Sequence, residues 1–325
     1  MKIKAIQIDA QGGPEVMQYR DAELAAPAAH EITIRHKAIG INYIDTYHRS
    51  GLYPVKLPSG LGMEAAGTVE AVGADVKTFK VGDRAAYGSG PIGAYADANN
   101  VAASRAVKIP DGVSDEAAAA MMLKGMTAQF LLRQTFVVKA GDTILYHAAA
   151  GGVGLIATQW AKHLGATVIG TVGSDDKAKI AKAHGCDHVI NYRTENVPER
   201  VKEITGGKKL PVVYDGVGKD TFMMSLDCLA PRGLLVSFGN ASGPVTGVDL
   251  GILAAKGSLF VTRPTMFHYA ATDADFQAVA KDLFDVVATG KVKIEIGQRY
   301  KLADAQQAHK DLEGRKTTGA TVLIP

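Results

Sequence analysis

The chain has little cysteine. Only two cysteines, Cys186 and Cys228, occur among 325 residues, and they lie far apart in the sequence. Two isolated cysteines exclude a disulfide framework and favour a reducing compartment. We therefore expect a cytoplasmic protein.

The chain also lacks a charge excess and a long hydrophobic run. The 36 basic and 33 acidic residues are mixed along the sequence and leave a net charge of +3. No basic arm or stripe is present, so nucleic-acid binding is not expected. No apolar run reaches the roughly 18 residues of a membrane helix, and residues 1–6 alternate like a strand rather than a signal peptide. The length is enough for two domains with their own cores.

The first part of the chain predicts a compact, mostly antiparallel β domain. Residues 31–38 alternate with the period of a strand, and further strand candidates are 67–72, 84–87 and 107–110. Turns rich in glycine and proline separate them. Beyond residue 112 the pattern changes to helices over 117–123, capped by Ser114, and over 127–135.

From residue 143 onward strands and helices alternate, which predicts a parallel sheet covered by helices on both faces. The predicted strands are 143–147, 167–172, 188–190, 212–215, 233–238 and, at the sheet edge, 258–262. The predicted helices between them are 153–164, 176–184, 197–205 and 220–229. The tail, with helices 275–289 and 303–313 and strands 298–300 and 319–323, is assigned to the first domain. The fold class is thus α/β: residues 125–267 form a Rossmann domain inserted in a β-rich domain of residues 1–124 and 268–325.

The stretch 143–154 is the most informative one. An apolar strand runs into a turn of small residues, and a helical pattern follows at once. Ala149, Gly151 and Gly154 have the spacing of a dinucleotide fingerprint, with alanine in the first glycine position. Such a turn lets the backbone approach a pyrophosphate, and the helix directs free N–H groups at it. A plain tight turn is the alternative. The predicted contacts are Gly151, Gly152 and Val153.

The end of the second strand of this unit indicates which dinucleotide is bound. An NAD site usually places an acid there to bond the ribose 2′-hydroxyl. Gly173 takes this place, and Ser174 and Lys177 follow. A missing carboxylate and a nearby ammonium suit a 2′-phosphate, which favours NADP(H). Asp175 or Asp176 would reverse this preference if either turned into the site.

Further candidate contacts follow the other strands. Tyr192 is expected either to bind the adenosine phosphate or to pack half-buried. Small residues end two more strands, where ligands of open α/β sheets lie, and they would admit the nicotinamide half. Each glycine there is equally explained by its turn. The predicted residues are Gly216, Phe238, Gly239 and Asn240.

Three segments together resemble a known family. They are residues 148–154 (AAAGGVG), 62–67 (GMEAAG) and 39–45 (IGINYID). They resemble the medium-chain dehydrogenase/reductase superfamily and, within it, the zeta-crystallin-like NADPH:quinone oxidoreductases. The resemblance covers essentially the whole chain. It implies a GroES-like β domain with an inserted Rossmann domain, NADPH as cofactor, and usually a homodimer.

Zinc-dependent members of that superfamily carry a catalytic cysteine, a Gly-His-Glu motif and a four-cysteine lobe. Here Met63 stands between Gly62 and Glu64, and the cysteines and histidines form no tight cluster of the kind zinc needs. We therefore expect no metal, and direct hydride delivery from the nicotinamide to a quinone. The alternatives are an enone or alkenal double-bond reductase and a non-catalytic NADPH-binding protein.

The resemblance also implies roles for single residues. A loop over residues 42–47 would line the interdomain cleft, with Asn42 and Tyr47 reaching the nicotinamide and the substrate. Tyr47 would donate a hydrogen bond to a developing oxyanion, or only pack on the cofactor. Asp45 would anchor the loop or touch the substrate; we prefer the anchor and still count it among the cofactor contacts.

Five more positions follow from the resemblance. Tyr53 would close the pocket or lie in a surface turn. Lys124 and Thr127 would lie at the domain junction, with Thr127 contacting the nicotinamide ribose or phosphate. Thr262 would lie near the carboxamide, and Arg263 near the cleft mouth. The predicted catalytic residues are Asn42, Tyr47 and Arg263.

Overall fold

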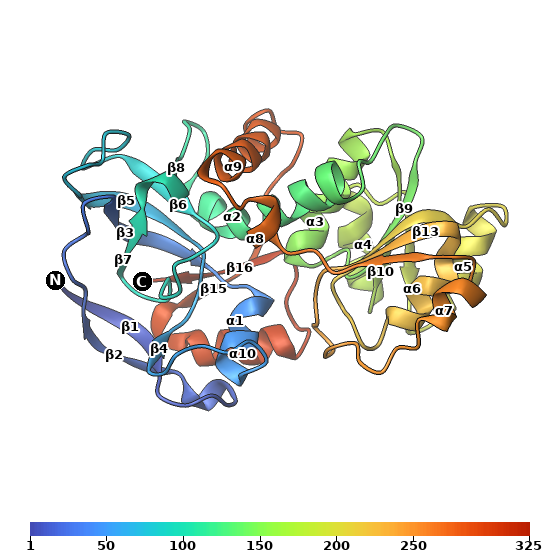
Figure 1. Ribbon diagram of the computed structural model, residues 1–325, viewed down its shortest axis with the longest axis horizontal. Coiled ribbons are helices and arrows are strands. Elements are labelled where there is room, and N and C mark those ends of the chain that lie inside the picture. Colours follow the sequence, from blue (N-terminus) through green and yellow to red (C-terminus); the bar gives the residue numbers. More distant parts are fainter. The chain divides into compact units, whose positions relative to one another are not determined.

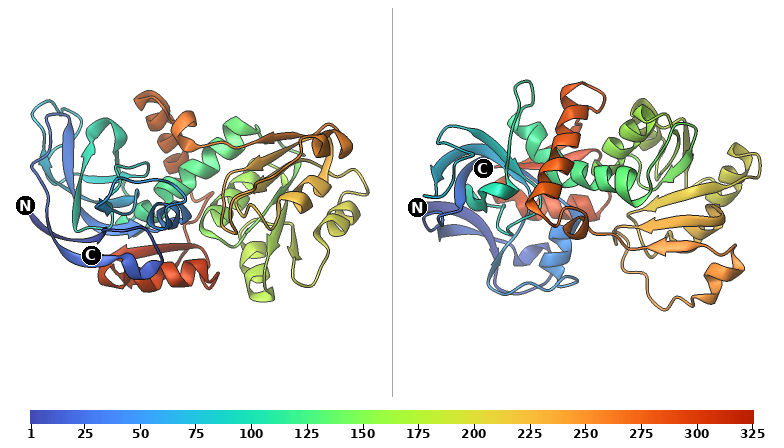
Figure 2. Two further views of the ribbon diagram at one scale, coloured as in Figure 1. Left: turned by 60° about the horizontal axis from the view of Figure 1, so that its bottom comes forward. Right: turned by 45° about the horizontal axis from the view of Figure 1, so that its top comes forward.

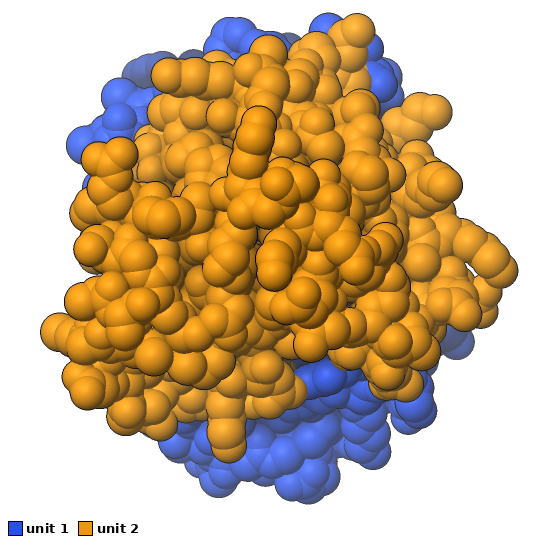
Figure 3. All heavy atoms as spheres, turned by 90° about the vertical axis from the view of Figure 1, so that its right-hand side faces the viewer, with its two compact units in different colours: residues 1–126, 270–290, 294–325 blue, residues 127–269, 291–293 orange.

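The computed structural model describes residues 1–325, which divide into two compact units (Figure 3). The first unit comprises residues 1–126, 270–290 and 294–325, and the second comprises residues 127–269 and 291–293. The predicted boundaries, after residues 124 and 267, each lie two residues before those of the second unit. The short return of residues 291–293 to the second unit is not part of the prediction.

The first unit is built on a seven-stranded sheet with the order β15-β16-β3-β5-β6-β8, with β7 also paired to β3 (Figure 1). All of its pairings are antiparallel except that of β15 with β16, which confirms a mostly antiparallel β domain. A second, three-stranded sheet has the order β2-β1-β4. The strands are β1 (Lys2–Ile8), β2 (Gln18–Glu23), β3 (Glu31–Gly40), β4 (Ser59–Gly60), β5 (Ala65–Val72), β6 (Arg84–Tyr87), β7 (Ala98–Ala102), β8 (Val107–Lys108), β15 (Ile296–Lys301) and β16 (Ala320–Ile324).

The core of the first unit follows from alternation along its strands. Ile32 and Ile34 of β3 and Ile6 and Ile8 of β1 are almost fully buried in one apolar cluster. The helices of this unit are α1 (Tyr43–Ser50), α9 (Asp273–Ala288) and α10 (Ala305–Glu313), with the short turns η1 (Pro14–Val16), η2 (Ala103–Arg105) and η4 (Leu302–Asp304). Ala305 and Ala308 bring α10 into the same cluster. Hydrogen bonds from Tyr43 and Arg49 join α1 to α10.

Two predictions about helices are wrong. The predicted helices 117–123 and 127–135 are one continuous helix, α2 (Asp115–Phe130), which runs on into the π-helical turn η3 (Leu131–Thr135). Gly125 does not break it, because its missing side chain makes room for α9: a Cβ there would lie 2.6 Å from Leu283 Cδ2. Ser114 does cap the helix, since its Oγ accepts the Ala117 N–H at 3.1 Å.

The predicted loop over residues 42–47 is instead the first turns of α1. The Asp45 carboxylate, in the first turn, accepts the backbone N–H of Asn42 at 2.8 Å. Such a bond satisfies an N–H that the helix itself leaves unpaired, and so stabilises the start of the helix. Gly51, with φ +87°, then ends it in the left-handed conformation that glycine tolerates best.

The second unit is a six-stranded parallel sheet with helices on both faces, as predicted (Figure 2). Its order is β11-β10-β9-β12-β13-β14, so the last strand lies at the edge, also as predicted. The strands are β9 (Thr143–Tyr146), β10 (Thr167–Val172), β11 (His188–Asn191), β12 (Leu210–Asp215), β13 (Leu229–Ser237) and β14 (Phe260–Thr262). The helices are α3 (Gly152–His163), α4 (Asp175–Ala183), α5 (Val197–Ile204), α6 (Phe222–Cys228), α7 (Gly251–Ala255) and α8 (Met266–Tyr269).

The strand order of the second unit determines where a ligand binds. From β9 the chain proceeds to β10 and β11 on one side, and then returns to place β12 on the other side of β9. Ligands of open α/β sheets bind at the carboxyl ends of the strands beside such a reversal. A ligand is therefore expected at the turn after β9 and at the ends of β10 and β12. None of the helices of either unit is long and apolar enough to cross a membrane.

Candidate active site

The turn after β9 leaves the first N–H groups of α3 without a side-chain cap. Gly151 is the N-cap, with extended backbone (φ −84°, ψ 174°), and no side chain bonds the first turn. By contrast, Ser174, Asn196 and Thr272 cap α4, α5 and α9. An uncapped N-terminus at the end of a parallel strand suits an anion, because its N–H groups and dipole both attract negative charge.

The glycines of this turn have different roles. A Cβ on Gly154 would lie 2.7 Å from the backbone oxygen of Ala149, so the packing of helix on strand requires glycine there. A Cβ on Gly151 would meet only the Ala148 oxygen, at 3.2 Å. Gly151 is therefore less crowded than Gly154, and a ligand can approach its backbone closely. Ala148 itself has φ +54°, a conformation that non-glycine residues adopt mostly under local constraint.

Alanine replaces the first glycine of the fingerprint for a steric reason. Ala149 is fully buried, and a Cβ on Gly170 of β10 would lie only 2.7 Å from the Ala149 methyl group. The two positions cannot both carry a side chain. The methyl group of Ala149 thus fills the space that Gly170 leaves.

The structure brings the residues predicted after β10 together. The Tyr192 hydroxyl lies over Gly173, since a Cβ there would be 2.5 Å from it. Ser174 Oγ accepts the backbone N–H of Lys177 at 3.3 Å, which places Lys177 in the first turn of α4. A glycine, a hydroxyl and a half-buried lysine thus lie where an NAD site has a carboxylate.

The two acids that complicate this interpretation are held elsewhere. Asp175 Oδ1 accepts Asn191 Nδ2 at 2.9 Å, and Asp176 pairs with Lys179 at 3.1 Å on the surface. Neither carboxylate takes the place at Gly173. The end of β10 therefore presents hydroxyl and ammonium groups, which suit a phosphate, and no carboxylate.

The turn after β12 is organised by a buried carboxylate. Asp215 accepts the N–H groups of Val217 and Gly218 at 2.8 and 3.0 Å and the hydroxyls of Thr221 and Ser225 at 2.8 Å. These bonds satisfy a charge that would otherwise be costly to bury. The result is a rigid turn at the end of the strand next to β9.

The predicted glycines of this region are explained by packing. A Cβ on Gly216 would lie 2.8 Å from the ring of Phe238, and one on Gly239 would lie 2.8 Å from Gly216 Cα. The turns after β12 and β13 therefore contact each other through their backbones. The structure brings Gly216, Phe238 and Gly239 together, and close packing alone requires the two glycines.

Arg263, after β14, connects the ends of two strands. Its Nη1 donates to the Ser237 carbonyl at 2.8 Å, and its Nη2 donates to the Asn240 amide oxygen at 3.1 Å. Thr262 is paired opposite Val236 in the sheet. Arg263, Asn240 and Thr262 thus form one group at the carboxyl end of the sheet.

His147 is a buried polar residue of this region that sequence reasoning missed. Its Nδ1 lies 2.8 Å from Thr171 Oγ1, and its Nε2 lies 3.0 Å from Ser225 Oγ, which in turn bonds Asp215. Burial lowers the pKa of this histidine. The group joins β9, β10, β12 and α6 directly below the glycine-rich turn. A histidine at the end of an apolar strand was its only signal.

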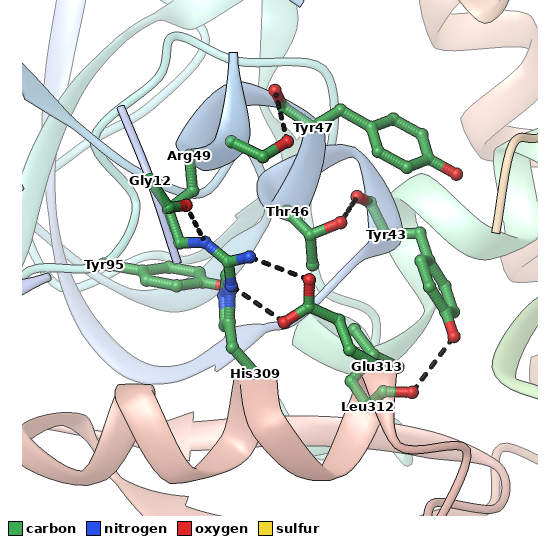
Figure 4. A network of polar contacts seen from close by, with 10 residues as sticks. Gly12, Tyr43, Thr46, Tyr47, Arg49, Tyr95, His309, Leu312 and Glu313 are labelled. Atoms are coloured by element: carbon green, nitrogen blue, oxygen red, sulfur yellow. Dashed lines mark hydrogen bonds and ion pairs between the residues drawn. The ribbon is translucent and has the colours of Figure 1, made fainter. Parts of the chain in front are cut away.

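In the first unit, four of the predicted residues lie on α1 or within three residues of its ends. Asn42 is its N-cap and Asp45 lies in its first turn. Tyr47 and Tyr53 contact each other edge to face, with ring centroids 5.2 Å apart. In Figure 4 the hydroxyl of Tyr47 points away from the group that joins Arg49 to Glu313. Tyr47 is therefore not part of that polar group.

A buried ion pair adjoins Asn42. Glu64 is fully buried, and its Oε2 accepts both Lys124 Nζ and Asn42 Nδ2 at 2.7 Å. Its Oε1 accepts the Leu123 N–H, also at 2.7 Å. A Cβ on Gly40 would lie 2.6 Å from Glu64 Cδ, so glycine at this position makes room for the carboxylate. Thr127, three residues after Lys124 on α2, is half-buried.

Two family models match the chain: an alcohol dehydrogenase GroES-like domain over residues 28–111 and a zinc-binding dehydrogenase over residues 152–285. The chain is 60% identical to the quinone oxidoreductase of Pseudomonas aeruginosa, covering 99% of both chains. It is 44% identical to the 2-haloacrylate reductase of a Burkholderia species, again over 99% of each. A crystal structure of Escherichia coli quinone oxidoreductase complexed with NADPH is 54% identical and superposes with a TM-score of 0.97, covering 99% of this chain and 100% of that one.

The fold and the two groups of residues thus define a medium-chain dehydrogenase/reductase. Within that superfamily the chain belongs to the quinone oxidoreductase family.

The residues present do not fit the zinc ion that the name of one matching model implies. Met63, buried, stands next to Glu64, whose two oxygens are already occupied by Asn42, Leu123 and Lys124. No three side chains of the histidine, cysteine, aspartate or glutamate type lie close enough to hold a metal. A tetrahedral zinc site needs at least three such ligands.

Gly151→Val is expected to weaken dinucleotide binding by at least about 100-fold, because the side chain occupies the space next to the uncapped N–H groups. Folding should be retained, since the nearest atom to a Cβ is 3.2 Å away. Fluorescence titration with NADPH and a thermal melt check both statements. Gly251→Val, at the start of α7, is the matched control. Wild-type affinity in Gly151→Val would refute the assignment of this turn.

Proposed function

We propose that this protein is an NADPH-dependent quinone reductase that works without a metal. The observation that carries the proposal is the group at the end of β10, where Gly173, Ser174, Lys177 and Tyr192 replace the carboxylate of an NAD site. The relatives named quinone oxidoreductase, at 54–60% identity over nearly the whole chain, support the same activity. Two structural neighbours complexed with NADPH support the cofactor.

The cofactor would be held by the second unit. Gly151, Gly152 and Val153 would bind its pyrophosphate through backbone N–H groups. Lys177, with Ser174 and Tyr192, would bind the 2′-phosphate, because an ammonium and two hydroxyls are donors to it. The group around Thr262 and Arg263 would adjoin the nicotinamide half, together with Gly216 and residues 238–240. Thr127 and Asp45 remain proposed cofactor contacts.

When bound, NADPH supplies the hydride. The quinone gains that hydride and one proton from water, so two electrons and two hydrogens convert it to a quinol. Asn42 and Tyr47 would contact the acceptor, and the Tyr47 hydroxyl would donate a hydrogen bond to the oxygen on which negative charge develops. Arg263 is the third residue proposed to act in catalysis. A quinone is already electrophilic, so this mechanism needs no strongly shifted acid.

A second candidate is the reduction of an electron-poor double bond. The observation that favours it is the relative at 44% identity that is named 2-haloacrylate reductase. Such an alkene would also receive a hydride and a proton and would differ from a quinone mainly in shape. A non-catalytic NADPH-binding protein would keep the same nucleotide turn.

Two further properties are proposed. Strand β14 presents Phe260 and Val261 at the sheet edge, 61% and 39% exposed, and an apolar edge of this kind favours pairing with a second copy. We therefore propose a homodimer, and a monomer in sedimentation at micromolar concentration would overturn it. We also propose a cytoplasmic location, which cell fractionation tests.

Acceptor-dependent oxidation of NADPH, followed by its absorbance with a panel of quinones and alkenals, is the direct test. We expect faster turnover with quinones and little with NADH. Higher kcat/KM values for alkenals would establish the second candidate. Tight NADPH binding without turnover on any acceptor would leave only the binding protein.

Lys177→Ala is expected to weaken NADPH roughly 10- to 100-fold and NADH very little, because only NADPH carries the 2′-phosphate that the ammonium would bond. Lys179→Ala is the control: it lies on the same helix, its side chain is 79% exposed, and it pairs with Asp176. Fluorescence titration of both cofactors provides the measurement. Equal losses for NADPH and NADH would exclude the proposed role of Lys177.

A further inference from the structure

A chain of buried polar groups crosses the first unit beneath α1 (Figure 4). It begins at Arg49, whose side chain is 3% exposed although it is always charged. The guanidinium donates to both oxygens of Glu313, at 2.8 and 3.0 Å, and to the Gly12 carbonyl at 3.1 Å. Its remaining contact is His309 Nδ1, at 3.0 Å. Arg49 therefore joins α1 to the fully buried histidine of α10.

Arg49 determines the tautomer of His309. A guanidinium only donates, so His309 Nδ1 must accept. Burial, reinforced by the charge of Arg49, lowers the pKa of His309 to about 3, so the ring is neutral and its hydrogen lies on Nε2. That hydrogen is directed at Tyr95 Oη, 3.0 Å away. The Tyr95 hydroxyl is then left to donate to Asp45 Oδ2, at 2.9 Å.

From Arg49 through His309 and Tyr95, the donated hydrogens thus lead to Asp45. The same Oδ2 atom accepts the Asn42 N–H at 2.8 Å, while Oδ1 is buried without a hydrogen-bond partner. Burial raises the pKa of Asp45 to about 7. The bonds from Asn42 and Tyr95 and the charge of Lys124 on α2 act against burial, whereas Glu64 acts with it. His309 of α10 and, beyond it, Arg49 of the same helix as Asp45 connect to Asp45 through Tyr95.

We propose that Arg49, His309 and Tyr95 are positioning residues of the reaction site: they direct the Tyr95 hydroxyl at Asp45, and Asp45 holds Asn42 at the start of α1. The link to Asn42 is direct, since its backbone N–H bonds Asp45 while its side chain bonds Glu64. Asn42 is thereby fixed from two sides by buried carboxylates. The catalytic part of this proposal rests on the proposed function, in which Asn42 contacts the acceptor.

A second tyrosine–histidine pair in the same unit lacks the feature on which the proposal depends. Tyr87 Oη lies 3.1 Å from His36 Nε2, and His36 Nδ1 lies 2.7 Å from the Ala96 carbonyl. The carbonyl only accepts, so the hydrogen is on Nδ1 and Tyr87 donates to Nε2. The polarity is the reverse of that at His309, and the pair ends on backbone rather than on a carboxylate. Both tyrosines are fully buried, which makes Tyr87→Phe a matched control for Tyr95→Phe.

Tyr95→Phe removes one hydrogen bond to the charged form of Asp45 and keeps the ring. The pKa of Asp45 should therefore rise further, by about one unit. In the unmodified protein, kcat/KM for the quinone should fall as the pH drops below about 7. In Tyr95→Phe this acid limb should move up by about one pH unit. Tyr87→Phe should leave it in place, and Asp45→Asn should abolish it.

Thermal unfolding against pH gives a readout that does not require turnover. Asp45 has a higher pKa in the folded state than its ordinary 3.8, so the folded state binds more protons. The free energy of unfolding therefore falls as the pH rises from about 4 to about 7. Above that window the contribution of Asp45 is constant. Tyr95→Phe should extend the falling window upward by about one unit, Tyr87→Phe should not, and Asp45→Asn should remove the slope.

The two readouts separate the two proposals. Acid limbs and stability windows that move in Tyr95→Phe but not in Tyr87→Phe support the positioning chain. Equal behaviour of the two tyrosine variants would overturn it, whatever their activity. If the unmodified protein oxidises no NADPH with any quinone, the proposed function fails, and the unfolding profiles alone decide the chain. If Tyr95→Phe does not fold, the profile of Asp45→Asn decides, and an unchanged slope there refutes the proposal.

Discussion

The constraint on which the first unit depends is the burial of a carboxylate that has no access to water. Glu64 must find its donors within the protein, because an unpaired buried charge is costly. Lys124, Asn42 and the N–H of Leu123 supply them, and Gly40 leaves the space. One charge therefore joins the start of α1, the middle of α2 and the end of β3. A buried ion pair adds little net stability on its own. Its main effect here is to fix the positions of α1, α2 and β3 relative to one another.

The second unit differs in that the backbone N–H groups at the start of α3 have no side-chain partner. Most of its buried polar atoms are satisfied internally, as at Asp215 and His147. The N-terminus of α3 is an exception, since no side chain caps it. Rigid, satisfied surroundings keep that unsatisfied end in place without a ligand.

Much of the second unit was predictable from the sequence, whereas the environment of α1 was not. Strands such as β10 are short, apolar and bounded by glycines, and their alternation with helices indicated a parallel sheet. Residues 124–126 were not predicted to be helical, whereas Gly125 there admits Leu283 from a distant segment, a contact that the local sequence does not show. The helix at Asn42 was missed because polar residues dominate it and its stabilising partners, Tyr95 and Glu64, lie far away in sequence. The nucleotide residues form a local pattern; the chain from Arg49 to Asp45 depends on residues more than 200 positions apart.

The space that Gly170 gives up has a consequence for the sulfur chemistry of the protein. That space is shared by the methyl group of Ala149 and the thiol of Cys186, which lies against the same backbone. Burial raises the pKa of Cys186 to about 12, and Cys228, buried in the opposite apolar cluster, has a pKa of about 12 for the same reason. Only a thiolate reacts readily with an electrophile. Both sulfurs are therefore protonated and covered, so a protein that handles thiol-reactive quinones exposes no cysteine thiol to them.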